Sequence, residues 1–227
     1  MKIGILQTGH APDELLTGRG DYDAHFARLL ADGGFEFETY NVVDMQFPDG
    51  PSSCDGWLIT GSKHGVYEEH AFIPPLEQLI RDVYAAGVPL VGVCFGHQII
   101  AQALGGHVEK FKDGWAVGRT EYDWNGQKVA LNAWHQDQVI TPPKNASVVA
   151  ANDFCANAAL VYGDRAFTVQ PHPEFDSGFV EGLATHRGPG VVPDIQLAEV
   201  NSNLNKPVDN GLLAAKITRF FKERRVA

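Results

Sequence analysis

The stretch that most constrains the fold is residues 88–98, which joins a short apolar run, an abrupt turn and the start of a helical pattern. Residues 90–93 are apolar and have the length of a strand buried on both faces. Residues 97–104 carry apolar side chains at helical spacing, and two glycines follow where a helix would end. The pattern predicts a strand, a tight turn around Cys94 and a helix, which is the layout of a nucleophile elbow.

Gly92 and Gly96 lie two positions before and two positions after Cys94. In so sharp a turn, a side chain at either position would collide with its neighbours. The turn would expose the Cys94 sulfur at the N-terminus of a helix, where the helix dipole and unpaired N–H groups favour a thiolate. The alternative is a buried cysteine with no chemistry, because free cysteines often serve as small apolar core residues.

A second motif, His172-Pro173-Glu174, supplies what a catalytic cysteine requires. A cysteine nucleophile needs a base, and the base needs a group that orients it. In an extended segment, residues two apart point the same way, and the flanking prolines favour extended backbone. His172 and Glu174 would then lie side by side, with the carboxylate fixing the imidazole tautomer. Alone, this motif could equally be a surface turn.

The rest of the chain predicts an α/β protein whose character changes near residue 106. Before that point, apolar strand patterns alternate with helical ones: strands 2–7, 35–43 and 55–62, and helices 21–32 and 75–86. After it, short β-rich runs follow one another at 107–111, 118–124, 128–132, 147–151, 158–162 and 166–170. We interpret these runs as added or antiparallel strands that cover one end of the sheet.

The remaining segments are less regular. Residues 10–20 read as a loop that could form a substrate wall or a plain surface loop. Residues 177–185 and 211–225 have helical apolar faces, and residues 186–210 show no clear period, as expected of a flap or an interface segment. The length predicts a single domain over residues 1–227, with a core of about residues 1–176 and a C-terminal helical extension of about 177–227.

Composition excludes several classes of protein. The formal net charge of −10, without a basic cluster beyond the last residues, disfavours nucleic-acid binding. The three cysteines are too few and too widely spaced for a disulfide framework or a metal site, which favours a cytoplasmic location. The N-terminus reads as a strand rather than a signal peptide, and no apolar run is long enough to span a membrane. We expect no metal and no cofactor.

The combination of Gly-Val-Cys-Phe-Gly-His-Gln around Cys94 and the distant His172-Pro173-Glu174 resembles the class I (triad) glutamine amidotransferase family, in particular its stand-alone GMP-synthase-glutaminase-like and γ-glutamyl-peptidase-like members. The resemblance extends from Lys2 to about Phe175. It implies an open, mostly parallel, Rossmann-like (flavodoxin-like) sheet with flanking helices. It also implies a Cys94-His172-Glu174 triad that hydrolyses the side-chain amide of glutamine.

The resemblance assigns further roles by position. The family's oxyanion hole corresponds here to the backbone N–H groups of Phe95 and of the Gly61-Ser62 turn. Its glutamine contacts correspond to Gln98 and to a short segment whose backbone meets the α-amino and carboxylate end of the substrate. The residues matching that segment are Trp134, His135 and Gln136. We do not expect His135 to act as a base.

Three functions remain open at this stage. The first is a glutamine amidotransferase that releases ammonia for an acceptor on a separate synthetase chain, since no P-loop or second domain is visible here. The second is a γ-glutamyl peptide hydrolase that acts alone. The third is a catalytically silent binding protein, against which the intact Cys-His-Glu set argues. A cysteine α/β-hydrolase is a rival fold, disfavoured because its acid would precede the histidine in the chain. The oligomeric state is not predicted.

Overall fold

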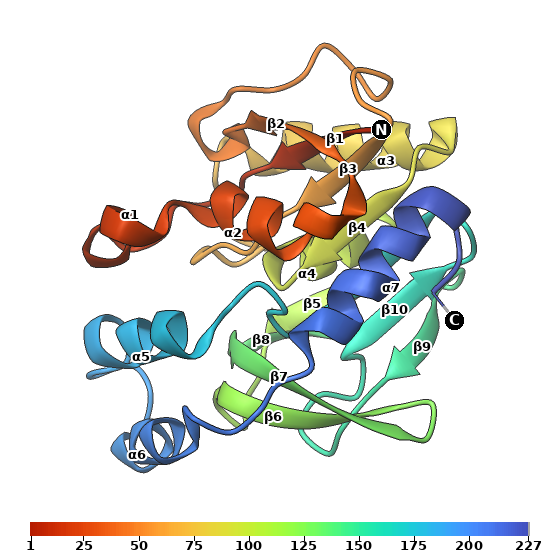
Figure 1. Ribbon diagram of the computed structural model, residues 1–227. Helices are drawn as coiled ribbons and strands as arrows, with labels where there is room; N and C mark the ends of the chain where they lie inside the picture. The colour runs from red at the N-terminus through yellow and green to blue at the C-terminus, as the bar shows by residue number, and fades with distance from the viewer. Residues whose placement is uncertain (227) are drawn as a thin grey trace.

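The computed structural model describes residues 1–226 and is built on one seven-stranded sheet (Figure 1). Its strand order is β2-β1-β3-β4-β11-β10-β9. The first five run parallel: β2 (Glu36–Tyr40), β1 (Lys2–Leu6), β3 (Gly56–Ile59), β4 (Leu90–Val93) and β11 (Ala166–Val169). At one edge, β10 (Ala159–Tyr162) and β9 (Ser147–Ala150) are added antiparallel. The parallel order is that of a flavodoxin-like doubly wound sheet, which confirms the predicted fold class.

Helices cover both faces of this sheet because its strands are apolar on both sides. On one face, Ile3, Ile5 and Val93 pack against α2 (Tyr22–Leu29) and α7 (Asn210–Glu223). On the other, Leu6, Trp57 and Ile59 pack against α3 (Ile73–Ala86) and α4 (Phe95–Ala103). Figure 1 shows the first pair of helices in front of the sheet and the second pair behind it. The C-terminal helix α7 therefore belongs to the main core.

Two small antiparallel pairs and three helices complete the fold beside the carboxyl ends of the strands. The pairs are β5 (His107–Lys110) with β8 (Asp137–Thr141), and β6 (Ala116–Trp124) with β7 (Gln127–His135). Helices α5 (Ser177–His186) and α6 (Asp194–Asn203) lie beside the β6-β7 ribbon, and α1 (Asp13–Arg19) contacts α5 (Figure 1). Short 3-10 turns occur at Ala31–Gly33 and Val42–Asp44.

Four local predictions were wrong. Residues 10–20 are not a plain loop, because they contain α1, whose helical path is broken by non-helical dihedrals at Thr17 and Gly18. Residues 186–210, predicted as an irregular flap or interface segment, contain α6, which shows no apolar period because Val200 is its only buried residue. Strand β8 was not expected. The added β strands also do not all cap one end, since β9 and β10 extend the main sheet.

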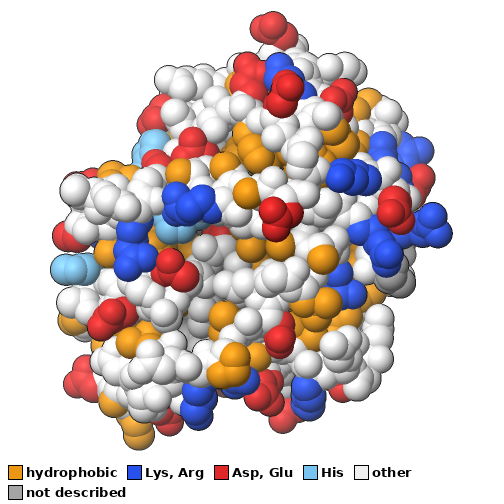
Figure 2. All heavy atoms as spheres, in the orientation of Figure 1, with side chains coloured by type: hydrophobic (Ala, Val, Ile, Leu, Met, Phe, Trp, Pro, Cys, Tyr) orange, Lys and Arg blue, Asp and Glu red, His pale blue; other side chains and the backbone are white. Residues whose placement is uncertain are grey.

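The surface carries charges of both signs. On the face shown in Figure 2, acidic and basic side chains are interspersed, with apolar side chains between them. Within residues 1–226 the longest helices, α3 and α7, have 14 residues, and no helix is long and apolar enough to cross a membrane.

Candidate active site

Cys94 lies in the turn between β4 and α4, with the dihedrals that the sharp reversal requires. Its φ of 53° and ψ of −105° are unusual for a residue other than glycine. A Cβ on Gly92 would lie 2.4 Å from the carbonyl oxygen of Gly96, and a Cβ on Gly96 would lie 2.3 Å from that of Ile59. Both distances are far inside van der Waals contact, so the predicted need for two glycines has a direct steric cause. Cys94 is only 6% exposed, but it lines a pocket.

His172 and Glu174 meet beside Cys94, but the predicted extended backbone was wrong, because Pro173 and Glu174 form a turn. Nδ1 of His172 lies 2.6 Å from Oε1 of Glu174, and both side chains are almost wholly withdrawn from solvent. The segment is held from the side by Asn132 on β7. Its carbonyl accepts the backbone N–H of His172 at 2.8 Å, and its side-chain amide donates to the carbonyl of Phe175 at 3.0 Å. The turn that presents the imidazole is thus fixed by a strand 40 residues earlier in the chain.

The surroundings of His172 favour its charged form. Burial alone lowers the pKa of this imidazole, but the Glu174 carboxylate and the Cys94 sulfur, by charge and by hydrogen bonding, together raise the pKa to about 10. The ring of Phe175 stacks on the imidazole at 4.0 Å between centroids, with an angle of 4° between the planes. The stack and the carboxylate fix the plane of the ring, and the arrangement favours an imidazolium beside the sulfur.

The Gly61-Ser62 turn lies directly against this pair. A Cβ on Gly61 would be 3.0 Å from Cε1 of His172 and 3.8 Å from Cβ of Cys94. Hydrogen bonds hold the turn in place: the Thr8 hydroxyl donates to the Gly61 carbonyl at 3.0 Å, and the Ser62 hydroxyl donates to the carbonyl of Thr8 at 2.7 Å. The turn is therefore fixed on one side of Cys94 and His172. On the other side, the N–H of Phe95 is the first of helix α4, where no intrahelical partner is available.

A pocket of about 300 Å³ opens in front of Cys94. Its walls come from segments far apart in the sequence, namely the chain after β1, the loop after β3, the small β pairs and α5. The lining residues include His10, Pro12, Tyr22, Gly61, Ser62, His64, Tyr67, Glu68, Cys94, Gln98, Lys110, Trp115, Trp134, His135, Gln136, Asp137, His172, Phe175 and Arg187. Residues 10–12 thus do form part of a wall, as one of the two interpretations of that segment expected.

The four predicted substrate contacts all line this pocket. Gln98 is buried rather than on a helix surface, and its amide donates to the carbonyl of Asp137 at 2.9 Å and to Oε1 of Gln170 at 3.1 Å. The Gln136 amide donates to the carbonyl of Phe111 at 3.2 Å. Burial lowers the pKa of His135 to about 3, so this imidazole is neutral and a poor base at neutral pH.

Sequence reasoning missed three residues that shape the site. Asn132 acts through its backbone and amide on the His172 segment. Phe175 stacks on His172, and Tyr22 in turn stacks on Phe175 with centroids 6.3 Å apart. Nothing in the local sequence marks Asn132 or Tyr22, because their roles depend on tertiary contacts. Phe175 directly follows the His-Pro-Glu motif, and this position in the sequence could have identified it as a neighbour of His172.

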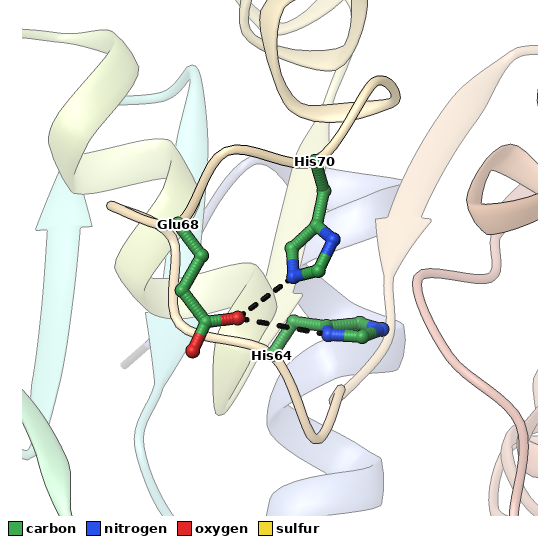
Figure 3. Close-up of side chains that lie close together, drawn as sticks. All are labelled: His64, Glu68 and His70. Carbon is green, nitrogen blue, oxygen red and sulfur yellow. Dashed lines mark hydrogen bonds and ion pairs between the residues drawn. The ribbon is translucent and has the colours of Figure 1, made fainter.

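One other group of side chains at the pocket mouth could hold an ion. His64, Glu68 and His70 bring three ligand atoms within 4.8 Å of one another (Figure 3). They come from the loop between β3 and α3, and two of them, His64 and Glu68, line the pocket.

Comparison with known proteins places the chain in a family. The sequence model of the glutamine amidotransferase class-I family matches residues 21–181, a range that contains Cys94, His172 and Glu174. A glutamine amidotransferase-like protein of Schizosaccharomyces pombe is 29% identical over 97% of this chain and 98% of its own length. Gamma-glutamyl peptidase 4 of Arabidopsis thaliana is 29% identical over 69% of each chain.

Among solved structures, a glutamine amidotransferase from Methylobacillus flagellatus superimposes with a TM-score of 0.73. The alignment covers 99% of this chain and 92% of that one at 21% identity, a likeness that concerns the fold alone. The family match spans well over half of the chain, and the resemblance first noted in the two sequence motifs is confirmed. The chain belongs to the class-I glutamine amidotransferase family.

Proposed function

We propose that this protein hydrolyses γ-glutamyl bonds through a thioester on Cys94, with the side-chain amide of glutamine as the first substrate. The observation that carries the proposal is the convergence, in one pocket, of the Cys94 sulfur at a helix N-terminus with a buried imidazole bonded to a carboxylate at 2.6 Å. This is the arrangement that nucleophilic catalysis by cysteine requires. The ammonia formed would pass to an acceptor on a separate protein.

The first half-reaction forms the acyl-enzyme. The Cys94 thiolate attacks the γ-carbonyl carbon, a C–S bond forms, and the carbonyl oxygen becomes an oxyanion. The backbone N–H groups of Phe95 and of the Gly61-Ser62 turn are the proposed donors to that oxyanion, each worth roughly 3–4 kcal/mol of barrier. The His172 imidazolium gives its proton to the leaving nitrogen, the C–N bond breaks, and ammonia or an amine leaves neutral.

The second half-reaction restores the enzyme. His172, now neutral, takes a proton from water, and the hydroxide attacks the thioester carbon. The C–S bond then breaks, glutamate leaves and the Cys94 thiolate returns beside an imidazolium. Glu174 stabilises the imidazolium that is present before acylation and again after hydrolysis. Gln98, Trp134, His135 and Gln136 are the proposed contacts for the glutamyl end, since all of them line the pocket.

A second candidate function is hydrolysis of γ-glutamyl peptides. It is favoured by the extent of the pocket, whose lining reaches Trp115 and Arg187. These residues could contact a leaving group larger than ammonia. A volume of about 300 Å³ is at the lower end of the range for pockets that enclose whole small molecules. The similarity to a gamma-glutamyl peptidase over 69% of the chain supports the same candidate.

Steady-state hydrolysis of L-glutamine, a panel of γ-glutamyl dipeptides and glutathione tests both functions. We expect turnover that Cys94→Ala abolishes and that Cys155→Ala retains. Cys155 is the matched control because it is also a buried free cysteine, but burial raises its pKa to about 12, so it stays a thiol. Faster cleavage of dipeptides than of glutamine would select the peptidase. Turnover that survives in Cys94→Ala would overturn the proposal.

A further inference from the structure

The loop between β3 and α3 carries three potential metal ligands that converge on one point. Glu68 presents a single carboxylate oxygen, Oε2, to two imidazoles: Nε2 of His70 lies 2.7 Å from it and Nδ1 of His64 lies 3.7 Å from it. Figure 3 shows both dashed lines ending on that oxygen, with the two rings approaching from the same side of the loop. An isolated ion pair would need only one imidazole, and at a surface such a pair is worth about 0–1 kcal/mol.

The spacing of the three ligand atoms fits a transition-metal cation. With metal–nitrogen and metal–oxygen distances of about 2.0–2.2 Å, two ligands of a tetrahedral ion lie about 3.4 Å apart. The observed separations of 2.7 Å and 3.7 Å fall on either side of that value, and all three ligand atoms lie within 4.8 Å of one another. Both measured separations from Glu68 Oε2 therefore lie within about 1 Å of the tetrahedral value.

The two imidazoles are held in place by packing, independently of any ion. Their ring centroids lie 4.0 Å apart, and both rings pack on Phe72, with centroids 5.9 Å and 5.8 Å from it. Phe72 is buried and packs on Phe95, the first residue of α4. Backbone hydrogen bonds from Glu68 to Gly65 and within the same turn shape the loop. The ligand set is thus largely preorganised.

The chemistry of the ligands selects the kind of ion. Two imidazoles and one carboxylate suit zinc and its first-row neighbours, whereas calcium and magnesium prefer oxygen ligands throughout. Three protein ligands leave a fourth position for water or another small ligand. Because His64 and Glu68 also line the Cys94 pocket, an ion on these ligands would lie beside that pocket.

We propose that His64, Glu68 and His70 form a binding site for a divalent cation of the zinc class at the mouth of the Cys94 pocket. The site is separate from Cys94, His172 and Glu174, and its ligands come from one loop. That loop also supplies the Gly61-Ser62 turn, and the Ser62 hydroxyl accepts the backbone N–H of His64 at 3.2 Å. Metal occupancy would accordingly restrain the turn as well as the mouth.

The test is a titration of Cys94→Ala protein with Zn²⁺ by calorimetry and with Co²⁺ by visible absorption. The Cys94→Ala background removes the rival site, a thiolate next to an imidazole. We expect the protein to bind one equivalent of metal. The absorption spectrum of its Co²⁺ complex should be that of nitrogen and oxygen ligands, without a thiolate charge-transfer band. In that background, His70→Ala and Glu68→Gln should each weaken binding at least about tenfold, since loss of even an outer-shell partner costs that much.

His107→Ala in the same background is the matched control. His107 is also exposed and also lies near a carboxylate, Glu109 at 3.2 Å, but no third ligand among residues 1–226 lies beside the two. Its replacement should leave the affinity unchanged. His70 is 34% exposed on a loop, so its removal should not prevent folding, and circular dichroism of each variant checks this. Affinity that is unchanged in both His70→Ala and Glu68→Gln, or absent from the Cys94→Ala protein, would overturn the proposal.

Discussion

Nδ1 of His172 lies 2.6 Å from Oε1 of Glu174, although the two residues are separated by a proline and buried against a strand from another part of the chain. The contact ties the tautomer and charge of the imidazole to one carboxylate. Because burial opposes the charge on His172, the partner carboxylate has to offset that cost locally.

Replacing Glu174 with Gln should keep the size of the side chain but remove its charge. The pKa of His172, about 10 in the native protein, should fall because the carboxylate is the largest of the effects that raise it. We expect the alkaline limb of the kcat/KM profile for γ-glutamyl hydrolysis to move to lower pH. The maximal rate should fall at least about 100-fold, the usual contribution of general acid–base catalysis. An unshifted alkaline limb in Glu174→Gln would contradict the coupling.

The same pair should make stability depend on pH in a defined direction. The folded pKa of His172, about 10, lies above the ordinary value of 6.5, so the folded state holds this proton more tightly than the unfolded chain. Its stabilising contribution should be complete below pH 6.5 and should be lost as the pH rises through about 10. Urea denaturation of wild-type protein and His172→Gln at several pH values measures it as the difference in unfolding free energy. A difference that grows with rising pH would reverse the assignment.

The two glycines around Cys94 give a prediction about stability. A Cβ on Gly92 or on Gly96 would meet a backbone carbonyl oxygen at 2.4 Å or 2.3 Å, and backbone atoms cannot move aside as a side-chain end can. We expect Gly92→Ala and Gly96→Ala each to lose about 2 kcal/mol or more of unfolding free energy. Gly211→Ala in α7 is the control, because nothing lies within 4 Å of its added Cβ. It should lose nothing and could gain up to about 1 kcal/mol.

Much of the sheet could be predicted from the sequence because its strands are locally distinctive. The apolar runs at β1, β3 and β4 are buried on both faces, and each is followed by a turn of small or polar residues. The sharp turn at Cys94 and the contact of His172 with Glu174 also followed from local motifs, although Pro173 and Glu174 form a turn rather than the predicted extended segment. Their meeting in one pocket was an inference from the family resemblance.

The rest could not be read from local patterns. Helix α6 has one buried residue, Val200, so no apolar period marks it. Asn132, within β7, holds the His172 segment through an isolated antiparallel bridge, which only the fold creates. The cluster of His64, Glu68 and His70 combines an i,i+4 and an i,i+2 spacing, which no single helix or strand would bring to one point, and a loop brings the three side chains together. Each of these features depends on tertiary contacts rather than on neighbours in sequence.

The backbone of Cys94 itself gives the last prediction. With φ of 53° and ψ of −105°, a side chain at this position costs on the order of 1–3 kcal/mol, which glycine would avoid. We therefore expect Cys94→Gly to be at least as stable as Cys94→Ala, although glycine is ordinarily less stable than alanine by about 0.5–1 kcal/mol. Both variants should lack activity, and chemical denaturation of the two compares their stability directly. If Cys94→Gly were the less stable by the ordinary amount, the turn would hold no strain, and the cysteine would be at no conformational disadvantage there.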